Sequence, residues 1–258
     1  MSYLKRRMQL AAMGRCLALL IVMSFAQIAL AQSTLFNIPS TDVVAGKKVY
    51  TEFDYFANLP KQDAGMFQWF VPRAVVGVGA NIEAGANVLI THQAGVTNTF
   101  FQPNIKWKFL NSEMKGVAGS GGIIWYTPMN NRESTDSNGV VTKVDSYGLV
   151  YGNFSKKFTG TYGPRFTAGP YGIVGANDGY IGTKAGAIIG LEQPVHPKMT
   201  IVADWFSGVS GFGYFTPGVS VTLPHSSLLN IGYSIGNDSY ESGNNNRALF
   251  IYYGITLN

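Results

Sequence analysis

Residues 248–257 read ALFIYYGITL, and apolar side chains alternate with smaller or more polar ones along this stretch. One face carries only apolar side chains, those of Leu249, Ile251, Tyr253, Ile255 and Leu257. Residues 212–223 and 228–236 repeat the pattern. A period of two residues is typical of β-strands, because successive side chains point to opposite faces. The C-terminal part of the chain is therefore predicted to form strands with one apolar face and one small, polar face.

The same pattern extends through the chain and predicts about twelve strands. They span residues 47–57, 67–79, 83–92, 99–110, 115–128, 146–158, 164–174, 181–192, 198–206, 212–223, 228–236 and 247–257. Connections after the even-numbered strands are tight turns, whereas the two longest connections, 129–145 and 237–246, follow odd-numbered strands. Short turns at one end and longer polar loops at the other are typical of outer-membrane barrels.

Composition distinguishes between a soluble β-sandwich and a membrane barrel as the arrangement of these strands. Only 13% of the 258 residues are charged, whereas about 25% is usual for a soluble domain. A soluble sandwich needs a charged outer face, but the second face here is mostly Gly, Ser, Thr, Asn and Tyr. We therefore predict an all-β fold, an antiparallel transmembrane β-barrel of about 12 strands (roughly 10 to 14), with short periplasmic turns and longer extracellular loops.

The N-terminus has the pattern of a secretory signal peptide. Four basic residues, Lys5, Arg6, Arg7 and Arg15, precede an apolar run that ends in Ala-Leu-Ala at residues 29–31. We assign residues 1–31 to this signal, 32–46 to a short periplasmic segment and 47–258 to the barrel. The alternative for 32–46 is that it caps or lines the periplasmic mouth. Without the signal, 15 basic residues face 14 acidic ones, so the basic total gives no support for a nucleic-acid partner.

Three stretches carry a resemblance to a known family. They are VVGVGANIEAGA at 75–86, QPNIKWKF at 102–109 and ALFIYYGITL at 248–257. With the signal peptide, they resemble the hairpins of Gram-negative outer-membrane β-barrel proteins of the porin-like transporter type. The resemblance implies a place in the bacterial cell outer membrane. Its implied partners are outer-membrane lipid and lipopolysaccharide, the barrel-assembly machinery during biogenesis, and small solutes.

The strand pattern also predicts which charged side chains face the lumen. A Lys or Arg that faced lipid near the midplane would cost about 2 to 4 kcal/mol, so charged positions are assigned to the inner face. The predicted pore-lining residues are Glu52, Asp54, Arg73, Glu83, Lys106, Lys108, Arg165, Lys184, Glu192 and Asp204. Glu52 and Arg73 should lie on neighbouring strands, roughly diagonal to one another. The faces of strands 115–128 and 146–158 stay unassigned.

These features favour a channel for passive diffusion of small hydrophilic or amphipathic solutes. Lumen-face glycines would leave space, and Arg73, Lys106 and Arg165 would set an anion preference against Glu52, Asp54, Glu83 and Asp204. The alternative is a structural or adhesive barrel whose lumen is closed by paired charges. The solute, gating and oligomeric state are not fixed by these patterns.

Enzymatic activity is less favoured. An outer-membrane lipid hydrolase would need a serine and an oriented histidine within hydrogen-bond reach. The three histidines, His92, His196 and His225, lie at a strand end or in turns without an evident orienting acid. Three scattered histidines and one cysteine give no metal-binding pattern, and no glycine loop for a nucleotide is present. We therefore expect no catalytic residues, no metal and no cofactor.

Overall fold

The computed structural model describes residues 33–58, 67–93, 95–130, 134–135, 141–142, 145–175, 182–239 and 246–257. The predicted signal peptide at 1–31 lies outside these residues. Within the described part of the chain, no helix is long and apolar enough to cross a membrane.

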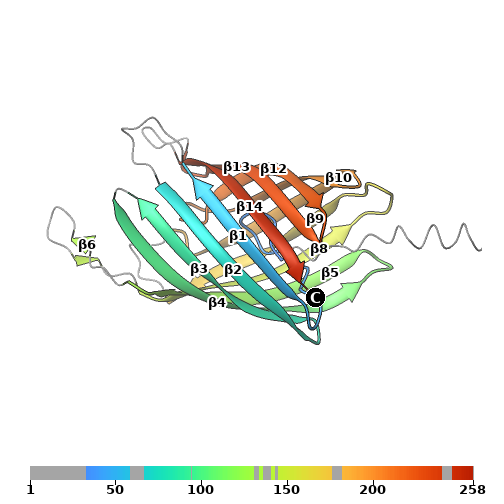
Figure 1. Ribbon diagram of the computed structural model, residues 1–258, viewed down its shortest axis with the longest axis horizontal. Helices are drawn as coiled ribbons and strands as arrows, with labels where there is room; N and C mark the ends of the chain where they lie inside the picture. The colour runs from blue at the N-terminus through green and yellow to red at the C-terminus, as the bar shows by residue number, and fades with distance from the viewer. Residues whose placement is uncertain are drawn as a thin grey trace, which may run out of the picture. The chain divides into compact units, whose positions relative to one another are not determined.

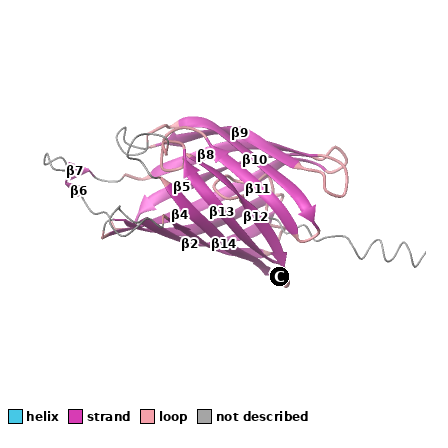
Figure 2. Cartoon of the chain, turned by 90° about the horizontal axis from the view of Figure 1, so that it is seen from above, coloured by secondary structure: helices cyan, strands magenta, loops and turns pink. Residues whose placement is uncertain are grey.

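The described strands form a closed antiparallel barrel of twelve strands (Figures 1 and 2). Its strands are β1 (Val49–Ala57), β2 (Phe67–Gly79), β3 (Ile82–Gln93), β4 (Val96–Ser112), β5 (Val117–Pro128), β8 (Tyr147–Lys157), β9 (Arg165–Val174), β10 (Ala185–His196), β11 (Met199–Phe206), β12 (Tyr214–Leu223), β13 (Ser227–Gly236) and β14 (Arg247–Leu257). Each strand pairs with the next, and β1 pairs with β14 to close the sheet. The predicted fold class and strand number are confirmed. Closure leaves no unpaired edge within the sheet.

Turn length differs between the two ends of the barrel as predicted. Ala80 and Asn81 alone connect β2 to β3, and both have positive φ angles, 50° and 59°. This geometry matches the type I′ turn that suits the twist of a two-residue hairpin. At the other end, the connection between β5 and β8 holds a second, two-stranded sheet of β6 (Ser134–Thr135) and β7 (Val141–Thr142). This short hairpin was not predicted.

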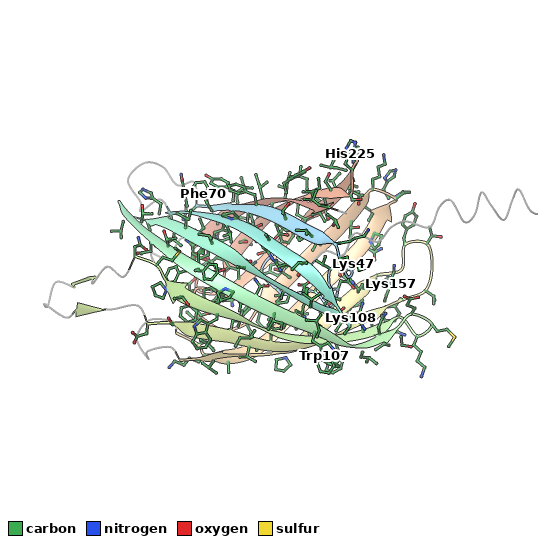
Figure 3. The ribbon with its side chains drawn as sticks, turned by 60° about the horizontal axis from the view of Figure 1, so that its bottom comes forward. Lys47, Phe70, Trp107, Lys108, Lys157 and His225 are labelled. Atoms are coloured by element: carbon green, nitrogen blue, oxygen red, sulfur yellow. The ribbon has the colours of Figure 1, made fainter. Side chains whose placement is uncertain are left out.

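The two faces of the barrel differ sharply in chemistry. Its exterior carries large apolar side chains, and Trp107 points away from the barrel in Figure 3. Further exposed members of this belt are Phe53, Phe101, Ile105, Phe109, Val150, Phe154, Phe166, Ile189, Ile201, Phe215, Ile231 and Tyr253. The orientation of β5 and β8, unassigned from the sequence, is now clear. Ser120 and Asn153 face inward and are fully buried, whereas Trp125 and Phe154 are exposed on the outside.

One tryptophan, Trp69 of β2, lies inside the barrel. It stacks on Phe56, with ring centroids 4.9 Å apart, and contacts Phe67 at 5.7 Å. Phe56 is buried and pairs directly with Trp69 across β1 and β2. Because opposed residues share a face of the sheet, Trp69 belongs to the aromatic lining of the lumen.

Candidate functional site

Residues 33–46, which we call the lumenal segment, lie among the inward-facing side chains of the barrel. Leu35 and Ile38 are fully buried, and Phe36 and Val44 nearly so. The segment continues into β1 through Lys47, whose N–H donates to the carbonyl of Gly77 at 2.8 Å. The sequence favoured a short periplasmic segment here over one that lines the mouth. The structure instead places these residues against lumen-facing positions on at least eight strands.

Glycines of the barrel wall provide the space that the lumenal segment fills. A Cβ atom at Gly190 would lie 2.8 Å from the side-chain ends of both Leu35 and Ile38. At Gly218 and Gly232 it would lie 2.5 and 2.8 Å from the ring of Phe36. These distances are shorter than van der Waals contact, so only glycine fits without displacement. The lumen glycines predicted to leave space therefore do so, but the segment takes up that space at these three positions.

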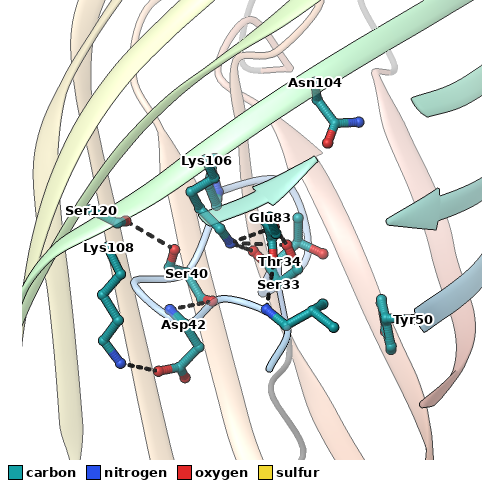
Figure 4. Close-up of polar contacts among 12 residues, drawn as sticks. Ser33, Thr34, Ser40, Asp42, Tyr50, Glu83, Asn104, Lys106, Lys108 and Ser120 are labelled. Carbon is teal, nitrogen blue, oxygen red and sulfur yellow. Dashed lines mark hydrogen bonds and ion pairs between the residues drawn. The ribbon is translucent and has the colours of Figure 1, made fainter. Parts of the chain in front are cut away.

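A buried charge cluster holds the start of the lumenal segment (Figure 4). Glu83 accepts hydrogen bonds from the Ser33 hydroxyl and, at 2.8 Å, from the Val44 N–H. Lys106 lies 3.1 Å from Glu83 and donates to the Ser33 carbonyl at 2.8 Å. The Glu83 and Lys106 side chains are only 1% and 3% exposed. Charges this deeply buried are tolerated because each is paired and hydrogen-bonded.

Arg73 extends this cluster across β1 and β2. Its guanidinium lies 3.4 Å from Glu52 and 3.9 Å from Glu83. It also donates to the hydroxyls of Ser33 at 2.8 Å and Thr34 at 3.4 Å. Glu52 and Arg73 were predicted on neighbouring strands, and they are direct partners in the β1–β2 register rather than diagonal ones. Arg73 thus connects two wall carboxylates to the lumenal segment.

A second ionic cluster surrounds Asp42 of the lumenal segment. Arg165 forms an ion pair with Asp42 and, on the next strand, with Glu192 at 2.5 Å. Lys108 lies 3.3 Å from the other Asp42 oxygen. Burial raises the pKa of Asp42, but the charge and hydrogen bond of Arg165, with the charges of Lys108 and Lys106, outweigh it and lower the pKa to about 2. Asp42 is therefore ionised over the whole physiological range.

Asp204 on β11 binds the middle of the lumenal segment through neutral donors. Its Oδ2 accepts the backbone N–H groups of Phe36, Asn37 and Ile38 at 2.9, 2.6 and 3.1 Å. The Asn37 side chain donates to its Oδ1 at 3.3 Å. Three converging N–H groups on one oxygen satisfy a carboxylate that is only 1% exposed.

Uncharged contacts complete the attachment along β5 and β8. The Asn153 side chain donates to the Pro39 carbonyl at 2.5 Å, and Ser120 donates to the Ser40 carbonyl at 3.4 Å. The hydroxyl oxygens of Thr41 and Ser155 lie 2.7 Å apart. Hydrogen bonds and ion pairs thus attach the segment to opposite parts of the wall. Water molecules can take the place of the segment in each of these polar contacts.

The structure positions the ten predicted pore-lining residues as follows. Nine lie within strands, and eight of these nine belong to the contacts described above. The ninth, Asp54, faces Tyr252 in the register of β1 and β14, and its Oδ1 is buried without a hydrogen-bond partner. Lys184 precedes the first residue of β10 rather than lying within the strand. Whether these side chains line an open pore remains a prediction.

The basic residues predicted to set an anion preference are paired with carboxylates of the wall. Arg73, Lys106 and Arg165 are each paired with wall carboxylates, Glu52, Glu83 and Glu192. Their charges are therefore largely compensated where they stand, because a close opposite charge cancels most of the field in a pore. The sequence predicted that Arg73 lies near Glu52 but did not predict the pairs of Lys106 with Glu83 and of Arg165 with Glu192.

Sequence reasoning also missed the functional residues of the lumenal segment, above all Phe36, Asp42 and Thr41. The available signal was composition. The fourteen residues STLFNIPSTDVVAG at 33–46 contain five large apolar side chains and one charge. An exposed lead-in would be more polar, so this segment has the composition of a buried one.

The three histidines weighed for a hydrolase lie near the end of β3, at the end of β10 and in a turn. His92 contacts the Thr97 hydroxyl at 3.0 Å, and His196 accepts the Lys198 N–H at 3.2 Å. His225 lies in the turn before β13 with a φ of 60°. No group of three or more His, Cys, Asp or Glu side chains that could hold a metal ion occurs among the described residues.

A closed antiparallel barrel with an apolar exterior and a polar interior is the architecture of an outer-membrane β-barrel protein, and this chain belongs to that structural class. No family model and no curated protein matches the sequence. Among solved structures, an outer membrane channel from Pseudomonas putida is similar at 9% identity, a TM-score of 0.49, and coverage of 83% of this chain and 97% of that chain. Outer membrane phospholipase A from Escherichia coli is similar at 14% identity, a TM-score of 0.44, and coverage of 82% and 92%. Both are distant likenesses.

Proposed function

We propose that this protein is a passive outer-membrane channel for small hydrophilic or amphipathic solutes, closed by its own lumenal segment and open when that segment leaves the lumen. The observation that carries the proposal is how the lumen is filled. The wall bears glycine at Gly190, Gly218 and Gly232, and a separate stretch of chain occupies the resulting space. Removal of that stretch would leave a lumen whose wall carries small, polar and aromatic side chains.

The attachment of the segment supports reversible closure. Every polar contact between the lumenal segment and the wall is a hydrogen bond or an ion pair that water can replace. Three basic wall residues keep wall partners even without the segment, because Arg73, Lys106 and Arg165 pair with Glu52, Glu83 and Glu192. These three ion pairs would stay compensated in the open state, which favours an opening barrel over one that collapses.

The competing function is a structural or adhesive barrel with a permanently closed lumen. A small barrel can fill its interior with side chains of its own strands. Here the wall leaves room at Gly190, Gly218 and Gly232 that side chains of the segment fill, which favours a channel. Catalysis has no such support, so we propose transport without chemistry. Outer-membrane lipid and the barrel-assembly machinery remain proposed partners.

A reversible covalent lock tests the channel. Thr41→Cys with Ser155→Cys would place two thiols where two hydroxyl oxygens lie 2.7 Å apart, so that the two sulfur atoms start close to one another. Cys16 is the single native cysteine and is replaced by serine. Single-channel conductance is then recorded in planar bilayers for the oxidised and reduced protein. We expect discrete steps only after reduction.

The single variants Thr41→Cys and Ser155→Cys are the matched controls and should behave alike with and without reductant. Equal conductance of the locked and reduced forms would show that solutes bypass the segment. Absence of steps from reduced protein, even when Phe36→Ala and Asp204→Asn weaken the attachment, would favour the closed structural barrel.

A further inference from the structure

The part of the lumen that holds Phe36, Asn37 and Ile38 combines a carboxylate with an apolar floor. Among the described residues, no Lys or Arg side chain forms an ion pair with Asp204, and all its donors are the neutral N–H groups of the lumenal segment. Glu83, the other wall carboxylate that binds the segment directly, also has a basic wall partner, Lys106. Asp204 is thus a wall carboxylate whose compensation depends on the segment.

The ring of Phe36 occupies the apolar half of this site. It lies over Gly218 and Gly232, where added Cβ atoms would approach it to 2.5 and 2.8 Å. The rings of Phe250 and Tyr252 flank it, with centroids 5.6 and 6.1 Å away. Phe36 is only 4% exposed. Two glycines and two aromatic rings therefore form a compartment sized for one phenyl group.

Hydroxyl groups border the carboxylate on the β12 and β13 side. Thr216 Oγ1 accepts the Asn37 amide at 2.6 Å and lies 2.7 Å from the Ser234 hydroxyl oxygen. Both residues are fully buried. Carboxylate and hydroxyl oxygens together accept several N–H groups at once, which is what a primary ammonium with its three donors requires.

We propose that this site binds an organic monocation that carries an aromatic or compact apolar group, and that the lumenal segment closes the channel as an internal substitute for that ligand. The three N–H groups stand where the ammonium would donate, and Phe36 stands where the apolar group would lie. This inference rests on the proposed channel and names its solute class.

The negative charge of Asp204 favours a cationic ligand over a neutral or an anionic one. A neutral ligand would leave Asp204 without a charged partner, whereas an ammonium forms charge-assisted hydrogen bonds with it. The faces of Phe250 and Tyr252 would add cation–π attraction. An anion would meet the carboxylate at close range and be repelled.

Competition for the site provides the test. The rate of disulfide formation between Thr41→Cys and Ser155→Cys, in the Cys16→Ser chain, reports how often the segment is in place. Thr41 follows Ile38 by three residues, so displacement of Phe36 and Ile38 should separate the two thiols. The probes are phenethylammonium, neutral 2-phenylethanol and anionic phenylacetate, each added to the full-length protein in detergent or liposomes.

We expect phenethylammonium at a concentration of about ten times its Kd to slow disulfide formation about tenfold, since ligand and segment exclude one another. The neutral and anionic probes should have little effect. In the Asp204→Asn variant the three probes should act alike, although that change also weakens the segment. Glu113→Gln, in the exposed turn between β4 and β5, is the control for charge removal and should keep the discrimination.

An unchanged rate with phenethylammonium, or equal slowing by all three probes, would overturn the assignment of a cation site. Either outcome leaves the channel itself to the conductance experiment, which needs no ligand. Conversely, selective slowing by phenethylammonium in a protein that never conducts would support the binding site and contradict the channel. The two proposals can therefore fail separately.

Discussion

Arg165 on β9 binds Glu192 on β10 through two hydrogen bonds, Nε to Oε2 at 2.5 Å and a terminal nitrogen to Oε1 at 2.6 Å. The two residues are direct partners in the register of these strands. This bidentate geometry fixes the plane of the guanidinium and directs its remaining nitrogen to Asp42 of the lumenal segment. A wall-to-wall ion pair thus orients the group that holds the segment.

Replacement of this arginine should loosen the segment and weaken the barrel. Arg165→Met would leave Glu192 and Asp42 without their main partner, and we expect a loss of about 2 to 3 kcal/mol, below the range for fully buried pairs because these side chains are partly exposed. Arg165→Lys should recover only part of this, since lysine cannot donate in bidentate fashion. The urea midpoint of unfolding in lipid measures the effect. Arg247→Met, at an exposed position of β14, should leave it unchanged.

Attachment of the lumenal segment should weaken at acid pH through Asp42. Its pKa of about 2 in the attached state lies below its ordinary value of 3.8. The carboxylate therefore stabilises attachment fully above pH 3.8, and this contribution, about 2 kcal/mol, is lost as the pH falls toward 2. The rate of Thr41–Ser155 cross-linking between the introduced cysteines, corrected for thiol ionisation with a free-thiol standard, should fall over that range. Asp42→Asn should abolish this part of the pH dependence; an identical profile in both proteins would exclude Asp42 as its source.

A side chain at the glycine beneath Phe36 should open the channel. Gly232→Val would place atoms within 2.8 Å of the Phe36 ring and 2.9 Å of Thr216, and overpacking of this kind costs about 1 to 3 kcal/mol. We expect more frequent conductance steps from a barrel that still folds. Gly152→Val is the matched control, because a Cβ at Gly152 on β8 meets nothing within 4 Å. If both variants conduct alike, Phe36 does not contribute to closure.

Charge in the open lumen should depend on Arg73. Arg73→Met would leave Glu52 without its basic partner and Glu83 with Lys106 alone. The reversal potential in a salt gradient should shift toward cation preference once the lumenal segment is displaced. An unchanged reversal potential in open channels would place Arg73 outside the conducting path.

Much of the wall could be predicted because its signal is local. Alternation in ALFIYYGITL assigns each residue of β14 to a face, and the structure places Phe250 and Tyr252 inside and Tyr253 outside accordingly. Alternation does not assign the faces of a strand where the residues on both faces are of similar size and polarity. On β5 the run Gly119–Ser120–Gly121–Gly122 carries no contrast between its two faces, and an aromatic residue such as Trp69 suits both a membrane interface and a packed lumen.

The sequence by itself determined the class of fold, the number of strands and the inward position of the charged residues, because strand periodicity and the cost of a charge in lipid act residue by residue. Only the tertiary structure decided what fills the lumen. Asp204 meets Phe36 across 168 positions of sequence and Arg165 meets Asp42 across 123, and such contacts follow from closure of the sheet. No local pattern encodes them, since their energy exists only once the wall surrounds the segment.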